Sequence, residues 1–382
     1  MAYSIPYTLL IVFLGTLALL IHQRRDDESL CRKLTLAGVA TYFVFFAFRG
    51  FIFTDWLTYY VEFEQASLDL LVHYTPGESR EPLFLILMLL TKAVFNDFHF
   101  FVFICTAINT WLLIAFFRRY SDNIFLCLML YLVFEGFDIS INLMRNSIAI
   151  FLFLNAIQYL ESRKPLPYFG LCLAAIGFHF SAFVYLPLYF FFHIRMNRWV
   201  YLAILIVCNA VFVLHIPIFM KLISMVGIGG AFLENKIDAY AELSNRLGFG
   251  MGFIERFITG MLVFLYFDKL NAMRPTSKIF INALAAYFVC SFMFSEFTEI
   301  SKRLAMLFIF SYWIIWGDLI RCFAIPNNRR LFVAYLSIYC LLKITVTITQ
   351  PVNKYENLLF GKTKSYQERK YIFDRTFEEP KY

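Results

Sequence analysis

Charged side chains are scarce in this sequence, and their scarcity excludes most soluble proteins. Asp, Glu, Lys and Arg make up only 16% of the 382 residues, whereas hydrophobic residues make up 60%. The mean hydropathy is +0.67, a value that ordinary soluble domains do not reach. The sequence therefore predicts an all-α fold, that of a polytopic integral membrane protein.

Motifs of the common catalytic centres are also missing. The eight cysteines form no CxxC pair, and the six histidines lie far apart without an HExxH motif, so we expect no metal site and no cofactor. No GxxxxGK[ST] phosphate loop and no GxSxG serine occur. The formal charge of +7 lies in short basic clusters between apolar runs. We interpret it as membrane topology and expect no nucleic-acid partner.

Apolar runs follow one another along most of the chain. They predict about 12–14 transmembrane or re-entrant helices in a single transmembrane domain over 1–349. A charged C-terminal tail follows over 350–382, and we expect it to be partly disordered. The run 82–95 is short for a bilayer, so we predict a re-entrant or half-spanning segment there. The topology of 52–117 stays open, because an N-terminus on the cytoplasmic side would also restore the alternation of the spans.

The basic clusters predict the orientation of these helices. Arg24-Arg25, Arg118-Arg119 and Arg163-Lys164 are expected on the cytoplasmic side. The loops 52–80 and 217–253 then face outward, over a cavity. The middle of 217–253 is polar and compatible with a helix, so we predict a lid at the cavity mouth.

Arg145 is the most conspicuous charge, because it lies between the apolar runs 123–134 and 148–160. An ionisable group at membrane depth must face a bundle interior or a water-filled cavity and must have a partner. A structural ion pair between helices is the simpler interpretation. Several other ionisable residues also stand at the ends of apolar runs, which favours a functional site: Arg49, Asp55, His179, Glu255, Arg256, Glu299 and Arg303.

Asp55 lies among aromatic residues in the first outer loop, with Trp56 and Tyr59 following it. Aromatic rings stack on sugar rings, and a carboxylate accepts hydroxyl hydrogens or acts as a base. An aromatic belt at the membrane surface would give the same pattern. Glu81 precedes Pro82, and we expect this acid to cap a helix.

His179 and Ser181 occupy a predicted tight turn between two apolar runs. A lone histidine is more often structural than catalytic. Arginines beside acids and aromatic rings nevertheless suit a sugar-bearing lipid diphosphate, because guanidinium groups bind phosphate oxygens in a fork and a carboxylate or imidazole can deprotonate a sugar hydroxyl. The residues alone leave three functions open: glycan transfer from a polyprenyl carrier, transport of a lipid-linked glycan by a flippase, and addition of single sugars from a polyprenyl-phosphate sugar.

Five stretches stand in order over roughly 42–360: Arg49-Gly50 with Thr54-Asp55-Trp56 and Tyr59, Asn142 to Ile150, Phe178 to Ala182 with Pro187, Lys302-Arg303, and Tyr355-Glu356-Asn357. Together they resemble the pattern of the EpsG family. Thr58 departs from the pattern, because an asparagine is expected before the tyrosine.

This resemblance implies a Wzy-like polymerase of exopolysaccharide, capsule or O-antigen synthesis in the bacterial inner (cytoplasmic) membrane, with its active site on the outer, periplasmic side. Such an enzyme moves a growing glycan en bloc from undecaprenyl diphosphate to the non-reducing end of a lipid-linked repeat unit, without a metal. The implied partners are the undecaprenyl-diphosphate-linked oligosaccharide, membrane lipid, a chain-length regulator and a flippase.

The expected roles follow from both lines of argument. Arg145 and Arg49 are expected to hold the donor diphosphate, supported by Arg303 and Arg256. Asp55 is the first choice as base and His179 the second, with Glu135 or Asp138 behind them. Further substrate contacts are expected from Trp56, Tyr59, Asn142, Asn146, Ser181, Glu299, Tyr355 and Asn357.

Overall fold

The structure, a computed structural model, describes residues 2–73, 75, 80–218, 250–361 and 363–377. The protein is 79% helical, and the described residues contain no strand. Five helical segments are long and apolar enough to cross a membrane, or up to six if a pair bent by 64° counts as one span. The prediction of an all-α, polytopic membrane protein is therefore confirmed. The five segments are Ile5–Gln23, Glu28–Ala47, Phe98–Tyr120, Ile124–Ile141 and Pro326–Thr347.

The contacts between residues divide the chain into two compact units. Unit 1 comprises 1–189 and 332–382, and unit 2 comprises 190–331. The single domain over 1–349 stays a prediction.

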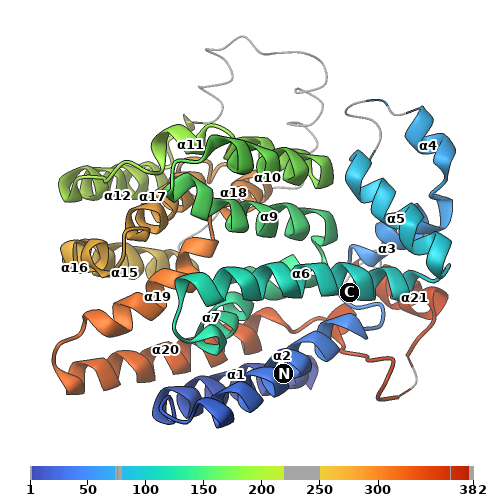
Figure 1. The fold of residues 1–382 in the computed structure, drawn as a ribbon, viewed down its shortest axis with the longest axis horizontal. Coiled ribbons are helices and arrows are strands. Elements are labelled where there is room, and N and C mark those ends of the chain that lie inside the picture. The colour runs from blue at the N-terminus through green and yellow to red at the C-terminus, as the bar shows by residue number, and fades with distance from the viewer. Residues whose placement is uncertain (1, 74, 76–79, 219–249, 362, 378–382) are drawn as a thin grey trace. The chain divides into compact units, whose positions relative to one another are not determined.

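Unit 1 is built around α9 (Met144–Glu161), which is buried on most of its circumference. It lies between α6 (Phe98–Tyr120) and α10 (Pro165–Phe178), as Figure 1 shows. The long helices α1 and α2 pack against each other, α1 also packs against α7, and α2 against α6. The other elements of unit 1 are η1 (Ala2–Ser4), α1 (Ile5–Gln23), α2 (Glu28–Ala47), α3 (Trp56–Gln65), α4 (Leu68–Val72), α5 (Pro82–Val94), α7 (Ile124–Tyr131), η2 (Leu132–Gly136), α8 (Phe137–Ile141), η3 (Phe180–Tyr185), η5 (Pro351–Asn353) and α21 (Tyr366–Phe377).

Unit 2 begins after Tyr189 and is also helical throughout its described part. Two further helices straddle the limits of the units: α11 (Leu188–Phe191) and α20 (Pro326–Thr347). Unit 2 contains α12 (Arg198–Val213), α15 (Met251–Leu265), α16 (Phe267–Met273), α17 (Ser277–Phe288), η4 (Val289–Met293), α18 (Thr298–Met306) and α19 (Phe310–Cys322).

Capping aspartates or a proline mark the N-terminal ends of several of these helices. The Asp27 carboxylate accepts the backbone N–H of Leu30 at the start of α2, and Asp97 accepts that of Phe100 at the start of α6. Pro82 begins α5, which has only 13 residues before the break at 95–97. A helix of that length falls short of the about 30 Å of a hydrocarbon core, so its re-entrant character stays a reasonable prediction.

The described residues of the C-terminal tail pack into unit 1, and the expected partial disorder stays a prediction. The Tyr7 hydroxyl donates to Asn353 O at 2.8 Å, and Leu358 N donates to Phe48 O at 2.7 Å. Farther along, Arg369 of α21 is 2% exposed and forms an ion pair with Glu356 at 3.2 Å. The tail thus packs into unit 1 because polar groups of α1 and α2 have their partners in it.

Candidate functional site

The N-terminal end of α9 brings together most of the site residues predicted in unit 1. Arg145 Nη1 donates to Glu81 Oε2 at 2.5 Å. The other carboxylate oxygen of Glu81 accepts the backbone N–H of Phe180 at 3.1 Å. One carboxylate therefore joins the start of α5, the start of α9 and the turn between α10 and η3.

Glu81 is the residue that the sequence reasoning undervalued. Glu81 stands at the N-cap position of α5, as predicted, but its side chain makes no capping hydrogen bond and is directed to Arg145 and Phe180 instead. Burial favours the neutral acid, but the Arg145 guanidinium and the Phe180 N–H hold the pKa of the Glu81 carboxyl below its ordinary value of 4.5. Both side chains of the pair are only 16% exposed. The sequence indicated such an acid only indirectly, because an arginine at membrane depth must have a partner.

His179 lies in the turn beside this pair. Its Nδ1 accepts the backbone N–H of Ser181 at 3.2 Å and lies 2.7 Å from Ser181 Oγ. That hydroxyl donates to Asn146 Oδ1 of α9 at 3.2 Å. With Nδ1 accepting in the turn, Nε2 is the ring nitrogen that carries the proton of the neutral imidazole.

A glycine permits the close packing that places this turn. A Cβ at Gly177 would lie 2.6 Å from Leu83 Cδ1, far inside van der Waals contact. The absence of a side chain at Gly177 lets the end of α10 approach α5. Phe180 N can then reach Glu81.

Asn142 fixes the position of Asp55. Its Oδ1 accepts the backbone N–H groups of Thr54 at 3.1 Å and of Asp55 at 3.2 Å. Its Nδ2 donates to Asp138 Oδ1 at 2.6 Å, which orients the amide. Asp138 was expected as a reserve base. In this structure its carboxylate holds the side chain of Asn142 in place.

Tyr59 lies close to both Arg145 and Asp55. The guanidinium carbon of Arg145 is 5.9 Å from the centre of the Tyr59 ring, within the range of a cation–π contact. Tyr59 N donates to Asp55 O at 3.1 Å at the start of α3. The charges of Arg145, Asp55 and Glu62 all act on the Tyr59 phenol.

Two buried polar atoms in this region retain hydrogen-bonding capacity. Arg145 Nε and Glu62 Oε2 have no hydrogen-bond partner among the described residues. The carboxyl of Glu62 also forms an ion pair with Arg80. Burial raises the pKa of the Glu62 carboxyl, although the charges of Arg80 and Arg145 oppose this effect. Unsatisfied buried groups are costly, so they indicate where a ligand would gain hydrogen bonds.

Arg49 lies in a different environment. It is 4% exposed, and its Nη1 donates to Phe46 O at 2.6 Å and to Thr106 Oγ1 at 3.1 Å. Its backbone pairs with that of Asn357 in an isolated bridge. Arg49 thus joins α2, α6 and the tail, and in this structure it positions neighbouring segments.

The EpsG family matches residues 34–359, which is most of the chain. This chain belongs to the EpsG family. Membership implies an exopolysaccharide-related, polymerase-like function of the glycosyltransferase kind. Comparisons with curated proteins and with solved structures gave no match.

The tail motif of this EpsG protein holds the end of α2. The Tyr355 ring stacks on Phe45 with ring centres 4.2 Å apart, and its hydroxyl donates to Phe45 O at 2.9 Å. Asn357 Nδ2 donates to Val44 O at 3.2 Å and to the Tyr355 hydroxyl at 2.9 Å. Both residues were expected to contact substrate. In this structure their side chains are engaged in holding the tail.

Trp56 is also packed inside the protein. It is 6% exposed, and its Nε1 donates to Phe53 O at 3.0 Å. Its ring contacts Phe51 and Tyr366, with centres 5.0 and 5.4 Å away. Trp56 therefore supports the start of α3, and its ring is buried in the apolar core of this region.

The remaining predicted residues lie on other elements. Glu135 has a φ of 71° in the distorted η2 segment, and its carboxylate is 3.9 Å from the Lys343 ammonium of α20. In unit 2, Arg256 Nε donates to the Tyr287 hydroxyl at 3.0 Å. Glu299 and Arg303 belong to α18 of unit 2. Their part in the site stays a prediction.

Two further expectations concern the lid and the metal. Most of the predicted lid over 217–253 lies outside the described residues. Among the residues that are described, no group of three His, Cys, Asp or Glu could hold a metal ion. The charged groups that do converge are those around Arg145.

Proposed function

We propose that this EpsG protein polymerises a lipid-linked glycan at the outer, periplasmic face of the bacterial inner membrane. It transfers the growing glycan en bloc from undecaprenyl diphosphate to the non-reducing end of a lipid-linked repeat unit. The acceptor hydroxyl oxygen bonds to the anomeric carbon of the donor, and the bond from that carbon to the diphosphate oxygen breaks. The hydroxyl proton passes to a base of the protein, and undecaprenyl diphosphate leaves as the anion.

The observation that supports this proposal most is the Arg145–Glu81 pair beside His179 and Tyr59. Arg145 supplies a fixed charge and a donor fork for the diphosphate, and its Nε is still without a partner among the described residues. Stabilising the leaving diphosphate in this way lowers the barrier of the transfer.

The base of the transfer is a carboxylate of the same cluster. While Glu81 is paired with Arg145 its pKa is low, and it is a weak base. A diphosphate that draws Arg145 away removes this charge, so the Glu81 carboxylate becomes more basic when the donor is bound. Asp55, near Tyr59, then binds the hydroxyls of the acceptor sugar, and His179 keeps the turn and Glu81 in place.

Reconstitution tests the proposal. Purified full-length protein in liposomes with undecaprenyl-diphosphate-linked repeat units should form a ladder of glycans on a gel, also in the presence of EDTA. Arg145→Ala should lower the rate by about 10²–10³-fold, the range found when one stabilising donor is removed. Arg330→Ala, at an exposed position of α20, is the matched control and should leave the ladder intact.

The products also separate the alternatives. A full ladder from Arg145→Ala would contradict the assignment of Arg145. Addition of a single sugar from a polyprenyl-phosphate donor would indicate an accessory glycosyltransferase. Movement of the lipid-linked glycan across the bilayer without any ladder would indicate a flippase.

A further inference from the structure

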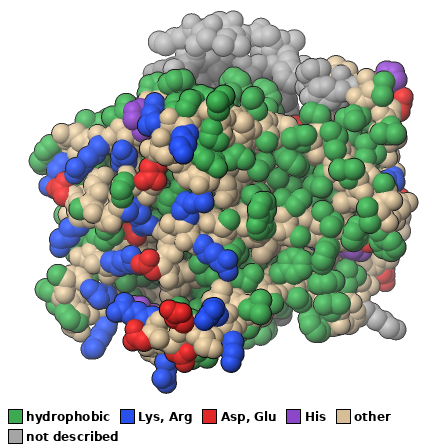
Figure 2. Space-filling view, viewed as in Figure 1, with side chains coloured by type: hydrophobic (Ala, Val, Ile, Leu, Met, Phe, Trp, Pro, Cys, Tyr) green, Lys and Arg blue, Asp and Glu red, His purple; other side chains and the backbone are tan. Residues whose placement is uncertain are grey.

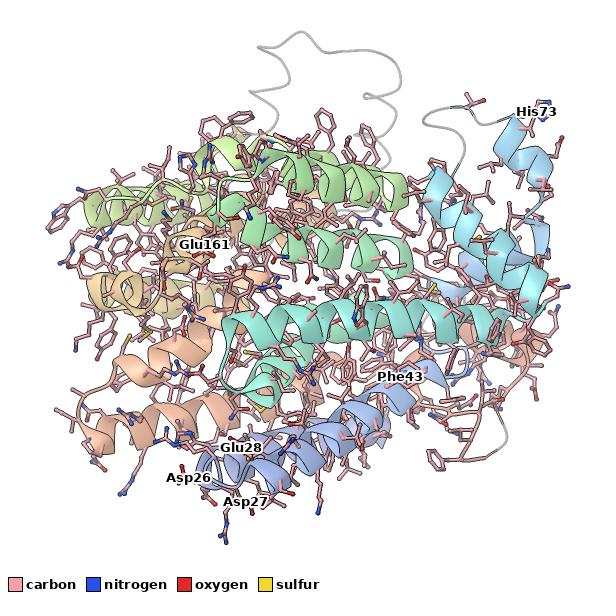
Figure 3. All side chains as sticks on the ribbon, in the orientation of Figure 1. Asp26, Asp27, Glu28, Phe43, His73 and Glu161 are labelled. Atoms are coloured by element: carbon pink, nitrogen blue, oxygen red, sulfur yellow. The ribbon has the colours of Figure 1, made fainter. Side chains whose placement is uncertain are left out.

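A hollow of about 560 Å³ lies at the connected ends of α1 and α2, beside the last turn of α6. Three arginines line it, Arg25, Arg32 and Arg118, together with one acid, Glu28. None of these residues belongs to the cluster around Arg145. Figure 3 labels Glu28 at the α1–α2 connection, and Figure 2 shows basic and acidic side chains gathered at the same edge.

The arginines come from two segments that are distant in sequence. Arg32 lies on one face of α2 with Glu28, Thr35 and Val39, because residues three and four apart share a helix face. Arg118 comes from α6, against which α2 packs. The fold therefore concentrates positive charge at this place.

Three acids lie in the α1–α2 connection, Asp26, Asp27 and Glu28, and only Glu28 lines the hollow. Glu28 and Arg32 are 3.9 Å apart with side chains 86% and 81% exposed, and such a pair contributes little. Asp27 is engaged in capping α2. Arg25 and Arg118 make no ion pair with any residue that the structure describes.

The side chains that line the hollow change from charged to apolar along α2. Leu36 and Val39 line the hollow one to two turns beyond Arg32, and Leu36 is 74% exposed. All three helices around the hollow are long enough to cross a membrane, and only 22% of the apolar window of α2 is buried within the protein. We therefore expect the hollow to lie where the helix ends meet the membrane surface, with its apolar part toward the acyl chains.

We propose that this hollow binds an anionic glycerophospholipid. Its phosphate lies among Arg25, Arg32 and Arg118, and its acyl chains run along Leu36 and Val39. The volume suits a headgroup and exceeds what a single phosphate ion needs. Basic pockets between membrane helices bind acidic headgroups by this combination of charge and aliphatic surface. The proposal does not depend on the polymerase activity.

Native mass spectrometry of delipidated, full-length protein in detergent tests this site. Phosphatidylglycerol should bind in preference to phosphatidylcholine. Each basic residue near an anionic headgroup contributes about fivefold to binding, so the triple variant Arg25→Gln, Arg32→Gln, Arg118→Gln should bind about a hundredfold more weakly. A control that removes three exposed charges elsewhere, Lys164→Gln, Arg330→Gln, Lys370→Gln, should bind like the wild type.

Two further arms separate a lipid from a soluble anion and from non-specific attraction. Leu36→Asn should weaken phosphatidylglycerol binding several-fold, and inorganic phosphate at the same concentration as the lipid should not displace it. Equal binding of phosphatidylcholine, or an equal loss in the control triple variant, would overturn the proposal. If inorganic phosphate displaced phosphatidylglycerol, and Leu36→Asn bound this lipid like the wild type, the hollow would be a site for a soluble anion. All altered side chains are exposed, and gel filtration with circular dichroism verifies that the variants fold.

Discussion

Arg145 can stay charged at the end of a mostly buried helix because the Glu81 carboxylate forms an ion pair with it. The backbone N–H of Phe180 holds that carboxylate in place. Breaking a pair of this kind leaves an uncompensated charge, and the loss exceeds the net stability of the pair itself. The sequence showed that Arg145 needed a partner. It could not show which acid, because Glu81 lies 64 positions away and its Glu-Pro context also suits a helix cap.

Glu81→Gln should destabilise the protein at neutral pH by about 2 kcal/mol, the contribution of a hydrogen bond to a charged group. Because the folded protein holds the pKa of Glu81 below 4.5, this contribution is present above pH 4.5. It is lost as the pH falls through the folded pKa. Thermal unfolding of both proteins at pH 7 and at successively lower pH measures the effect. A difference that stays constant down to pH 3 would contradict the role of the charge.

Arg145→Lys tests whether fork geometry matters in addition to charge. Lysine keeps the positive charge beside Glu81, so the melting temperature should stay close to that of the wild type. A single ammonium cannot bind two diphosphate oxygens in a fork, so the polymerisation rate should fall by about tenfold to a hundredfold. If the lysine variant were as active as the wild type, a positive charge at this position would be sufficient and fork geometry would not be required.

At the scale of elements, two contacts position the cluster: α10 against α5, and the tail against the end of α2. Neither follows from periodicity. The sequence indicated the turn at His179, yet the approach of α10 to α5 depends on the fit of Gly177 to Leu83. The charged composition of the tail indicated disorder, but Tyr7 and Arg49 have partners in it. Long-range pairing overrides local composition there.

Gly177→Ala should disturb the turn that carries His179. The new methyl group would overlap Leu83, and overpacking of this kind costs about 1–3 kcal/mol. Gly170→Ala, on the same helix, is the matched control because nothing lies within 4 Å of its Cβ position. It should stabilise α10 by up to about 1 kcal/mol. Thermal unfolding and ladder formation measure both variants, and equal effects would contradict the packing argument.

Asn357→Ala should loosen the loop that leads to Asp55. It removes the hydrogen bonds to Val44 O and to the Tyr355 hydroxyl, worth about 1–2 kcal/mol together after solvent exchange. We expect faster proteolysis of the tail and a lower polymerisation rate. Tyr371→Ala, at a side chain 63% exposed on α21, should change neither. Unchanged proteolysis of Asn357→Ala would show that the tail is held by other contacts.

At the scale of the whole molecule, composition and motif order were sufficient for the class and the family. The low charge content predicted a polytopic helical protein, and the stretches at Asn142 and His179 predicted the EpsG family. The division into two units could not be predicted, because it arises from packing between segments far apart in sequence, such as η1 with η5.

Topology is testable by cysteine labelling in a variant without the eight native cysteines. Asp69→Cys in α4 should react with a membrane-impermeant thiol reagent added to intact spheroplasts, because the proposed site faces the periplasm. Lys33→Cys should react only after the membrane is permeabilised. The reverse pattern would place the Arg145 cluster on the cytoplasmic side.

The pairing of the 48–53 loop with residues 352–358 also sets an order of events during biosynthesis. The ribosome completes this loop about three hundred residues before the segment that holds it, as the 310-residue separation of Tyr355 from Phe45 indicates. Until then the early helices must reside in the membrane with Arg49 lacking its final neighbours. We therefore expect a nascent chain to reach its folded arrangement around the 48–53 loop only after its last segment has docked.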